Sequence, residues 1–362
     1  MATAAQFTRL PHPAPTAAAD RAAVLADPGF GKCFSDHMVC IDWSEDKGWH
    51  NPVIGPRGPI ALDPAASVLH YAQEIFEGLK AYRTTDGGIA LFRPEANAAR
   101  FNASARRLAM PELPEDLFIG AIRELVAADS DWFPTVEGGS LYLRPFMIAT
   151  EAFLGVRPAK EYKFLVIASP AGNYFKSGAP AVSIWVSDYT RAAPGGTGAA
   201  KCGGNYAASL VPTAEAFANG HDQVLFLDAA EHKWIEELGG MNLFFVFSDG
   251  TLRTPALTGT ILPGITRDSL LQLAREEGLT VQEDRYSLDQ WRADAASGHL
   301  IETFACGTAA VVTPVGKVAD RTSEFTIGSG GPGQLTQKLR ARLVAIQRGE
   351  APDTHGWVTR LG

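Results

Sequence analysis

One lysine lies inside a segment built mainly of small residues, Gly195-Gly-Thr-Gly-Ala-Ala-Lys201-Cys-Gly-Gly-Asn205-Tyr206. A nucleotide-binding loop is excluded, because it needs glycine before the lysine and a hydroxyl residue after it, whereas Ala200 and Cys202 occupy those positions. Small neighbours let the backbone and a cofactor approach closely, which suits a lysine that forms a covalent Schiff base. The segment by itself fits an ordinary solvated loop lysine equally well.

A second candidate for chemistry is the start of a helix. Gly264-Ile-Thr-Arg267 precedes a helical pattern of apolar residues, and Gly278 marks its expected end. The first turn of a helix presents backbone N–H groups and the positive end of the dipole to an anion. This helix start is therefore a candidate site for an anion.

Apolar patterns predict the elements that position these residues. Strands are expected at residues 88–92, 164–168, 182–186, 223–227, 234–238 and 243–247, with a hairpin turn at Asp249-Gly250. The spacing of Ala98, Phe101, Ala105 and Leu108 predicts a helix. Another helix pattern follows Asn205, and Pro212 within it predicts a kink or a late helix start.

The length of 362 residues and the 46% hydrophobic content exceed what one core usually contains, so two domains are expected. We predict a flexible tail over residues 1–29, a small α/β domain over 30–170, an interdomain loop over 171–181 and a large domain over 182–362. The loop is inferred from a Gly- and Pro-rich stretch between two apolar strands. Both domains are expected to be mixed α/β.

Charge and composition exclude several classes of function. The net charge is −8 and no basic cluster is longer than Arg106-Arg107, so nucleic acid is not expected as a partner. No apolar run is long enough to span a membrane, and none forms a secretory signal. The four cysteines, at positions 33, 40, 202 and 306, form no CxxC pair, which fits a reducing cytoplasm.

The chain resembles the branched-chain aminotransferases, which are fold-type-IV pyridoxal-phosphate enzymes, from about Phe30 to its C-terminus. Besides the lysine segment, the resemblance rests on Phe34-Ser-Asp-His-Met38, His70-Tyr-Ala-Gln-Glu-Ile-Phe-Glu-Gly-Leu-Lys80, Leu91-Phe-Arg-Pro94, Leu141-Tyr-Leu-Arg-Pro145, Glu237-Leu-Gly-Gly-Met-Asn242, Leu262-Pro-Gly-Ile-Thr-Arg267 and Gly307-Thr-Ala-Ala310. It implies a smaller N-terminal α/β domain and a larger C-terminal mixed α/β domain.

The resemblance implies that pyridoxal 5′-phosphate is the cofactor. Lys201 matches the lysine that holds the cofactor and moves the substrate proton, and Glu237 matches the partner of the pyridine nitrogen. Because strand neighbours point to opposite faces, we expect Glu236 to face solvent. The other cofactor-binding positions implied are Arg100, Tyr206, Ile265, Thr266 and Thr308.

The resemblance also implies a substrate site. The expected aromatic box comprises Phe30, Tyr71, Phe76, Tyr142 and Tyr174, and the backbone of Gly240 and Ala309 is expected to bind the substrate carboxylate. Arg144 matches the residue that meets the side-chain carboxylate of glutamate. Leu154 and Val156 match residues that a second subunit supplies, which implies a homodimer.

The activity implied is ping-pong transamination of L-leucine, L-isoleucine and L-valine with 2-oxoglutarate, giving branched 2-oxo acids and L-glutamate in amino-acid biosynthesis. D-amino-acid aminotransferase and aminodeoxychorismate lyase share the lysine, the glutamate and the phosphate-binding positions. The segments Phe76–Lys80 and Tyr142–Arg144 favour branched-chain substrates over these alternatives. A catalytically silent binding protein of the same fold is a further alternative, which predicts loss of Lys201 or Glu237.

Two positions depart from the family pattern. Ala310 and Thr313 stand where mammalian members carry a redox-sensing CxxC, so thiol regulation at that place is excluded. Gly240 stands where those members have a threonine whose hydroxyl contacts the substrate carboxylate. We therefore expect only backbone N–H groups to serve there.

Overall fold

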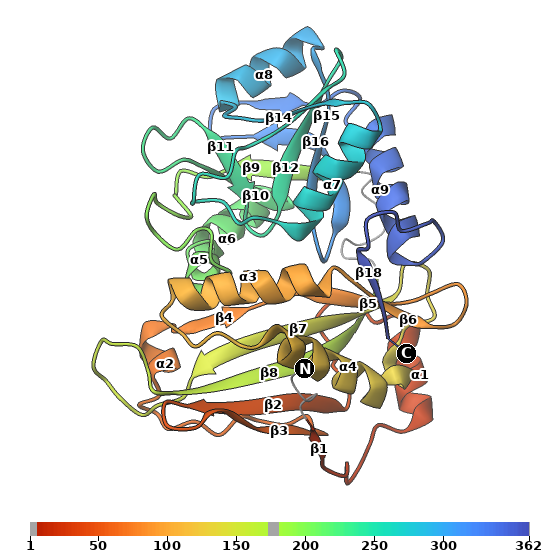
Figure 1. Ribbon diagram of the computed structural model, residues 1–362. Coiled ribbons are helices and arrows are strands. Elements are labelled where there is room, and N and C mark those ends of the chain that lie inside the picture. The colour runs from red at the N-terminus through yellow and green to blue at the C-terminus, as the bar shows by residue number, and fades with distance from the viewer. Residues whose placement is uncertain (1–5, 173–180, 362) are drawn as a thin grey trace. The chain divides into compact units, whose positions relative to one another are not determined.

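The computed structural model describes residues 6–172 and 181–361. The chain divides into two compact units. Unit 1 comprises Met1–Phe175, Ala200–Gly203 and Ile346–Gly362, and unit 2 comprises Lys176–Ala199 and Gly204–Ala345. Both are mixed α/β, as predicted (Figure 1).

Unit 1 is built on a sheet of nine strands among the described residues, in the order β1-β3-β2-β8-β7-β5-β6-β18, with β4 pairing with β7. Its strands are β1 (Thr8–Arg9), β2 (His37–Ser44), β3 (Gly48–Pro56), β4 (Glu74–Phe76), β5 (Leu79–Arg83), β6 (Ile89–Phe92), β7 (Ser140–Ala149), β8 (Glu161–Ala171) and β18 (Val358–Leu361). Its helices are α1 (Ala18–Ala26), α2 (Ser67–Tyr71), α3 (Pro94–Arg107) and α4 (Glu115–Ala128), followed by the 3-10 turn Ser130–Trp132.

Three buried phenylalanines join the helices of unit 1 to its sheet. Phe101 on α3 lies 5.4 Å from Phe118 on α4 and 5.5 Å from Phe164 on β8, measured between ring centroids. Large aromatic side chains dominate core energetics, and loss of one costs about 3–5 kcal/mol. This packing fixes the rotation of α3, which carries Arg100 and Ser104.

Unit 2 holds the second sheet, again of nine strands among the described residues, in the order β11-β10-β9-β16-β15-β12-β13-β14, with β17 on β16. Its strands are β9 (Val182–Val186), β10 (Gln223–Leu227), β11 (Ile235–Leu238), β12 (Asn242–Phe247), β13 (Thr251–Thr254), β14 (Thr280–Glu283), β15 (Leu300–Gly307), β16 (Val311–Ala319) and β17 (Glu324–Thr326). The helices after β9 are α5 (Gly203–Ala207), α6 (Leu210–Ala218), α7 (Ile265–Glu276), α8 (Leu288–Ser297) and α9 (Gln334–Gln347).

The predicted strands and turn of unit 2 are confirmed. Strand β12 is buried at every position, which explains its continuous apolar run, and the turn to β13 uses Gly250 at φ 85°. Helix α7 ends before Gly278, which has φ 81°. The late start predicted from Pro212 is also found, because α5 ends at Ala207 and the proline sits in the first turn of α6.

The two ends of the chain differ from the prediction. Residues 8–9 and 18–26 form a strand and a helix where the sequence predicts a flexible tail, because β1 pairs with β3. Residues 346–362 belong to unit 1, although 182–362 was predicted as one domain, because β18 pairs with β6. Most of the predicted loop at 171–181 lies outside the described residues.

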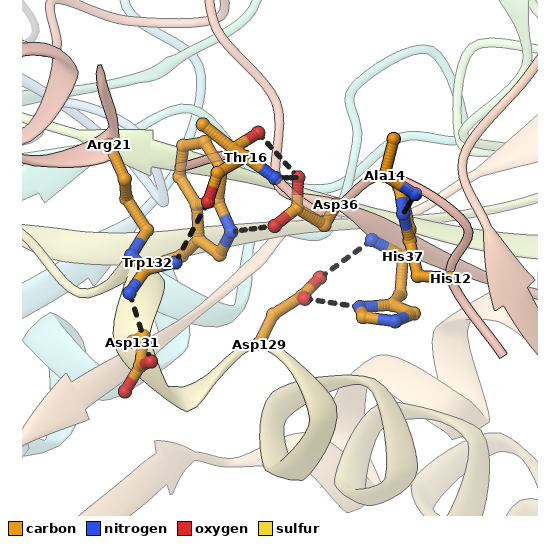
Figure 2. Close-up of polar contacts among 9 residues, drawn as sticks. All are labelled: His12, Ala14, Thr16, Arg21, Asp36, His37, Asp129, Asp131 and Trp132. Atoms are coloured by element: carbon orange, nitrogen blue, oxygen red, sulfur yellow. Dashed lines mark hydrogen bonds and ion pairs between the residues drawn. The ribbon is translucent and has the colours of Figure 1, made fainter. Parts of the chain in front are cut away.

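Side-chain hydrogen bonds hold the N-terminal segment against the rest of unit 1 (Figure 2). The Asp36 carboxylate accepts from the backbone N–H and the hydroxyl of Thr16, and from the indole of Trp132 at 3.1 Å. Nearby, Asp129 accepts from the backbone N–H of His37 and lies 2.6 Å from its Nδ1 atom. These partners are far apart in the sequence, so local patterns did not reveal them.

Within residues 6–172 and 181–361, no helix is both long and apolar enough to cross a membrane.

We predict that Asp36→Ala lowers the free energy of unfolding by about 1–2 kcal/mol, since three hydrogen bonds are lost at a partly exposed site. Trypsin should then cleave at Arg21 faster than in the wild type. Asp20→Ala, an exposed change on α1, is the control. Equal cleavage rates in the two variants would contradict the assigned role of Asp36.

The same carboxylate predicts a pH dependence. Burial raises the pKa of Asp36, but the hydrogen bonds from Thr16 and Trp132 outweigh it, so the pKa is lowered from 3.8. Its contribution to stability is therefore complete above about pH 4 and is lost as the pH falls further. The difference in unfolding free energy between wild type and Asp36→Ala should shrink correspondingly in acid.

Candidate active site

Lys201 lies in the short segment 200–203 that belongs to unit 1. Its backbone N–H donates to the buried hydroxyl of Ser104 at 2.9 Å, and its carbonyl accepts from the N–H of Phe76 at 2.9 Å. The Nζ atom lies 4.6 Å from the centroid of the Phe76 ring. The lysine therefore has a backbone fixed by α3 and β4 and an amine placed over an aromatic face.

Glu74 provides a third attachment for this segment. Its carboxylate accepts from the N–H of Gly203, and a Cβ atom at Gly203 would overlap the same carboxylate oxygen. Burial raises the pKa of Glu74, while Gly203 and Arg144 oppose the rise. Only glycine permits this approach, which explains one glycine of the lysine segment.

Several residues of the predicted aromatic box contact one another in unit 1. The rings of Phe30 and Tyr142 meet edge to face at 4.9 Å between centroids. Arg144 donates to the Tyr142 hydroxyl at 3.1 Å, and its guanidinium carbon lies 4.8 Å from the Phe76 centroid. The Nε atom of Arg144 is buried without a hydrogen-bond partner among the described residues. Phe76 thus contacts both the Lys201 amine and the Arg144 guanidinium.

Tyr71 lies in an exposed region together with the residues expected to reach a second subunit. Its hydroxyl donates to the carbonyl of Leu154, and the side chains of Leu154 and Val156 are 61% and 87% exposed. Exposed large apolar side chains are candidates for burial in an interface. Tyr174, also predicted in the box, lies outside the described residues.

Arg100 forms a buried ion pair that the sequence did not indicate. Its Nε and Nη2 atoms bond the two oxygens of Glu77 at 2.7 and 2.8 Å. Glu77 is fully buried, so the pair fixes the guanidinium rigidly on α3. Glu77 lies within the family segment Phe76–Lys80, but nothing in that segment indicated its pairing with Arg100.

In unit 2, the two neighbouring glutamates of β11 are both buried. Glu237 is 2% exposed and bonds Arg191 at 2.6 Å and the N–H of Leu262 at 3.1 Å. Glu236 is 6% exposed and accepts from the Thr260 hydroxyl. The expectation that Glu236 faces solvent is therefore wrong, because the loop before α7 covers it. Burial raises the pKa of Glu236.

The start of α7 offers backbone donors to an anion. Gly264 is its N-cap residue, with no side-chain cap, and a side chain at Gly264 would overlap the amide of Asn242. The predicted residues Ile265 and Thr266 form the first turn, and Thr266 is buried. Backbone N–H groups at a helix start are the kind of donor that the predicted phosphate role requires.

Of the remaining predicted positions of unit 2, Tyr206 lies in the short helix α5 and the others lie in loops. The ring of Tyr206 is 5.7 Å from the Arg191 guanidinium carbon. Thr308 and Ala309 form the half-buried turn between β15 and β16. The Gly240 carbonyl oxygen lies 3.5 Å from where a Cβ of Gly307 would stand, so Gly240 adjoins this turn.

The class IV amino-transferase family model matches residues 74–318 of this chain. A branched-chain-amino-acid aminotransferase of Mycolicibacterium smegmatis is 59% identical over 361 residues, covering 98% of each chain. The chain belongs to the class IV aminotransferases. The resemblance inferred from its motifs is thereby confirmed.

Solved structures support the fold of this aminotransferase. The branched-chain amino acid aminotransferase of Escherichia coli aligns with a TM-score of 0.75 at 29% identity, covering 89% of this chain and 99% of that chain. The branched-chain amino acid aminotransferase of Thermobaculum terrenum, solved in its PLP-form, aligns with a TM-score of 0.70 at 25% identity, covering 89% of this chain and 98% of that chain. The predicted fold type is confirmed.

Ala310 and Thr313 stand at the positions of the redox-sensing cysteines, and Cys306 is the cysteine closest to them along the chain. Ala310 and Thr313 are buried, and Cys306 is fully buried on β15. Burial raises the pKa of Cys306 to about 12, so its thiol is protonated at neutral pH. A protonated, buried thiol is unreactive towards mild oxidants.

We predict that Gly203→Ala lowers the free energy of unfolding by about 1.5–3 kcal/mol, because the added methyl displaces the Glu74 carboxylate from its hydrogen bond. Hydrogen exchange in peptides covering residues 200–203 should also accelerate. Gly204→Ala is the matched control, since open space surrounds that position. The role of Glu74 is disproved if both variants lose the same stability.

Proposed function

We propose that this class IV aminotransferase transfers amino groups between L-leucine, L-isoleucine or L-valine and 2-oxoglutarate, with pyridoxal 5′-phosphate as its cofactor. The proposal is carried by one observation, the placement of the Lys201 amine over Phe76 beside the cluster of Tyr142 and Arg144. The near full-length identity to enzymes named for branched-chain amino acids supports the substrate class.

The residues present fit this cofactor. Its aldehyde needs a primary amine, its pyridine nitrogen needs a carboxylate, and its phosphate needs N–H donors. Lys201 supplies the amine, and Glu237, held by Arg191, supplies a buried carboxylate. The first turn of α7, which begins at Ile265, supplies backbone N–H groups at the helix start.

We assign the other positions in the same proposal. Tyr206 binds the phenolic oxygen of the cofactor, and the phosphate is bound by Arg100, Ile265, Thr266 and Thr308. When bound, pyridoxal phosphate supplies an electron sink for the charge that develops at the substrate Cα. The Nζ atom of Lys201 would carry the proton from the substrate Cα to C4′ of the cofactor in one half-reaction and from C4′ to Cα in the other.

Two kinds of side chain must share the substrate pocket. Phe30, Tyr71, Phe76, Tyr142 and Tyr174 supply apolar walls for a branched side chain in this proposal. Arg144 binds the side-chain carboxylate of glutamate in this proposal. Its Nε atom has no hydrogen-bond partner among the described residues, so it can donate to that carboxylate. The backbone N–H groups of Gly240 and Ala309 bind the carboxylate on Cα.

We further propose that the protein acts as a homodimer in the cytoplasm, in branched-chain amino-acid biosynthesis. The exposed side chains of Leu154 and Val156 support the dimer, because burial of large apolar groups favours association. The four cysteines are all free, which fits a reducing compartment.

We predict that borohydride fixes the cofactor irreversibly to Lys201, because the reagent reduces a C=N bond between the lysine and the cofactor. Mass spectrometry of tryptic peptides should place the label on the peptide containing Lys201. Lys201→Ala should remain unlabelled, whereas Lys47→Ala, an exposed change, should label normally. A label on the buried Lys80 would disprove the assignment.

We predict that Arg144→Met slows the glutamate half-reaction about tenfold or more relative to the leucine half-reaction. A charge-assisted hydrogen bond contributes about 1.5–3 kcal/mol, and each 1.36 kcal/mol of barrier is tenfold in rate. Single-turnover absorbance measurements resolve the two half-reactions. Tyr142→Phe is the control, because it removes the hydroxyl that accepts from Arg144 but keeps the Arg144 charge. It should therefore not slow the glutamate half-reaction selectively. Equal losses with glutamate and leucine would remove the role proposed for Arg144.

A further inference from the structure

Arg191 lies in the loop after β9 and is one of the most deeply buried charged residues of unit 2. It is 5% exposed, and its Nη1 atom donates to the Oε1 atom of Glu237 at 2.6 Å. The side chains of this pair are only 1% and 3% exposed. The sequence analysis did not single out Arg191, because its segment carries no recognisable pattern.

The ion pair is not a well-satisfied structural contact. The Nε and Nη2 atoms of Arg191 are buried and have no hydrogen-bond partner within the described part of the chain. Burying a guanidinium with unmet donors is costly, so its presence at this position calls for an explanation. The ring of Tyr206, assigned above to the cofactor, lies 5.7 Å from this guanidinium.

The same Glu237 oxygen receives a second donor, the N–H of Leu262. Two donors on Oε1 orient the carboxylate, and the positive charge of Arg191 stabilises its ionised form. In a dry site, a carboxylate facing a protonated ring nitrogen tends to take the proton and leave both groups neutral. A cation on the far side of the carboxylate opposes that transfer.

We propose that Arg191 is a positioning residue that keeps Glu237 ionised, so that the proton stays on the ring nitrogen of the bound cofactor. This inference rests on the proposed function. Arg191 acts through Glu237, because the Glu237 carboxylate interacts with both the Arg191 guanidinium and the protonated cofactor ring. In the absence of the cofactor, Arg191 is the cation that compensates the buried carboxylate.

The experiment compares melting temperatures of the apoprotein alone, with pyridoxal phosphate, and with its 1-deaza analogue, which lacks the ring nitrogen. Arg191→Met should lower the melting temperature of the apoprotein, because Glu237 loses its cation. Pyridoxal phosphate should then raise the melting temperature of Arg191→Met by at least about twice as much as it raises that of the wild type, since the protonated ring supplies the missing positive charge. The deaza analogue should produce no such excess.

Three further variants separate charge from packing. Arg191→Met combined with Glu237→Gln removes both charges, so the apoprotein should regain stability and the excess gain from pyridoxal phosphate should vanish. Arg191→Lys keeps the charge and should retain an increment close to wild type. If Arg191→Met yields no folded protein, Arg191→Gln, which is polar but uncharged, carries the same comparison.

Two outcomes would overturn the proposal. Equal gains from pyridoxal phosphate and the deaza analogue in Arg191→Met would show that Arg191 serves packing alone. An apoprotein of the double variant as unstable as Arg191→Met would show that its partner is not Glu237. If the wild type gains nothing from pyridoxal phosphate, the proposed function itself fails, and that result differs from both.

Discussion

A carboxylate removed from water must be compensated by a cation or by hydrogen-bond donors, and the strand β11 buries two carboxylates in succession. Glu237 is compensated by Arg191 and by the N–H of Leu262, and Glu236 by the Thr260 hydroxyl. Because Thr260 and Leu262 lie on the segment that leads into α7, both glutamates also hold that segment. The helix start assigned to the phosphate therefore depends on the charges of β11.

In unit 1, the buried carboxylate of Glu77 is compensated by the guanidinium of Arg100. This ion pair is bidentate, since each carboxylate oxygen of Glu77 accepts one hydrogen bond from Arg100, whereas Arg191 donates one hydrogen bond to Glu237. Removing one partner of a buried pair typically costs about 3–5 kcal/mol, because the other charge remains. In each unit, a predicted cofactor-binding residue is oriented by a residue that was not predicted to contact the cofactor. Glu77 orients Arg100 in unit 1, and Arg191 orients Glu237 in unit 2.

Close backbone approach is the second constraint. Gly203 lies against Glu74, Gly264 lies against Asn242, and the backbone of Thr260 occupies the place of a side chain at Gly198. At these positions any side chain would displace a polar group that orients the lysine segment or the start of α7. The glycine content of the motifs follows from these contacts rather than from a need for mobile loops.

The sequence alone determined the family and six of the strands, because these depend on short motifs and on apolar periodicity. Strand β9, strand β10 and the late start of α6 at Pro212 are local features, and local patterns predicted them correctly. The roles of individual site residues stay predictions until the experiments above are made.

Only the tertiary structure decided which residues surround the motif residues. The partners of Lys201, Glu237 and Arg100 come from distant parts of the chain, so no spacing rule reveals Ser104, Arg191 or Glu77. The burial of Glu236 and the ordered N-terminal segment were missed for the same reason. Alternation along a strand predicts which way a side chain points, whereas its burial depends on what the rest of the chain packs against that face.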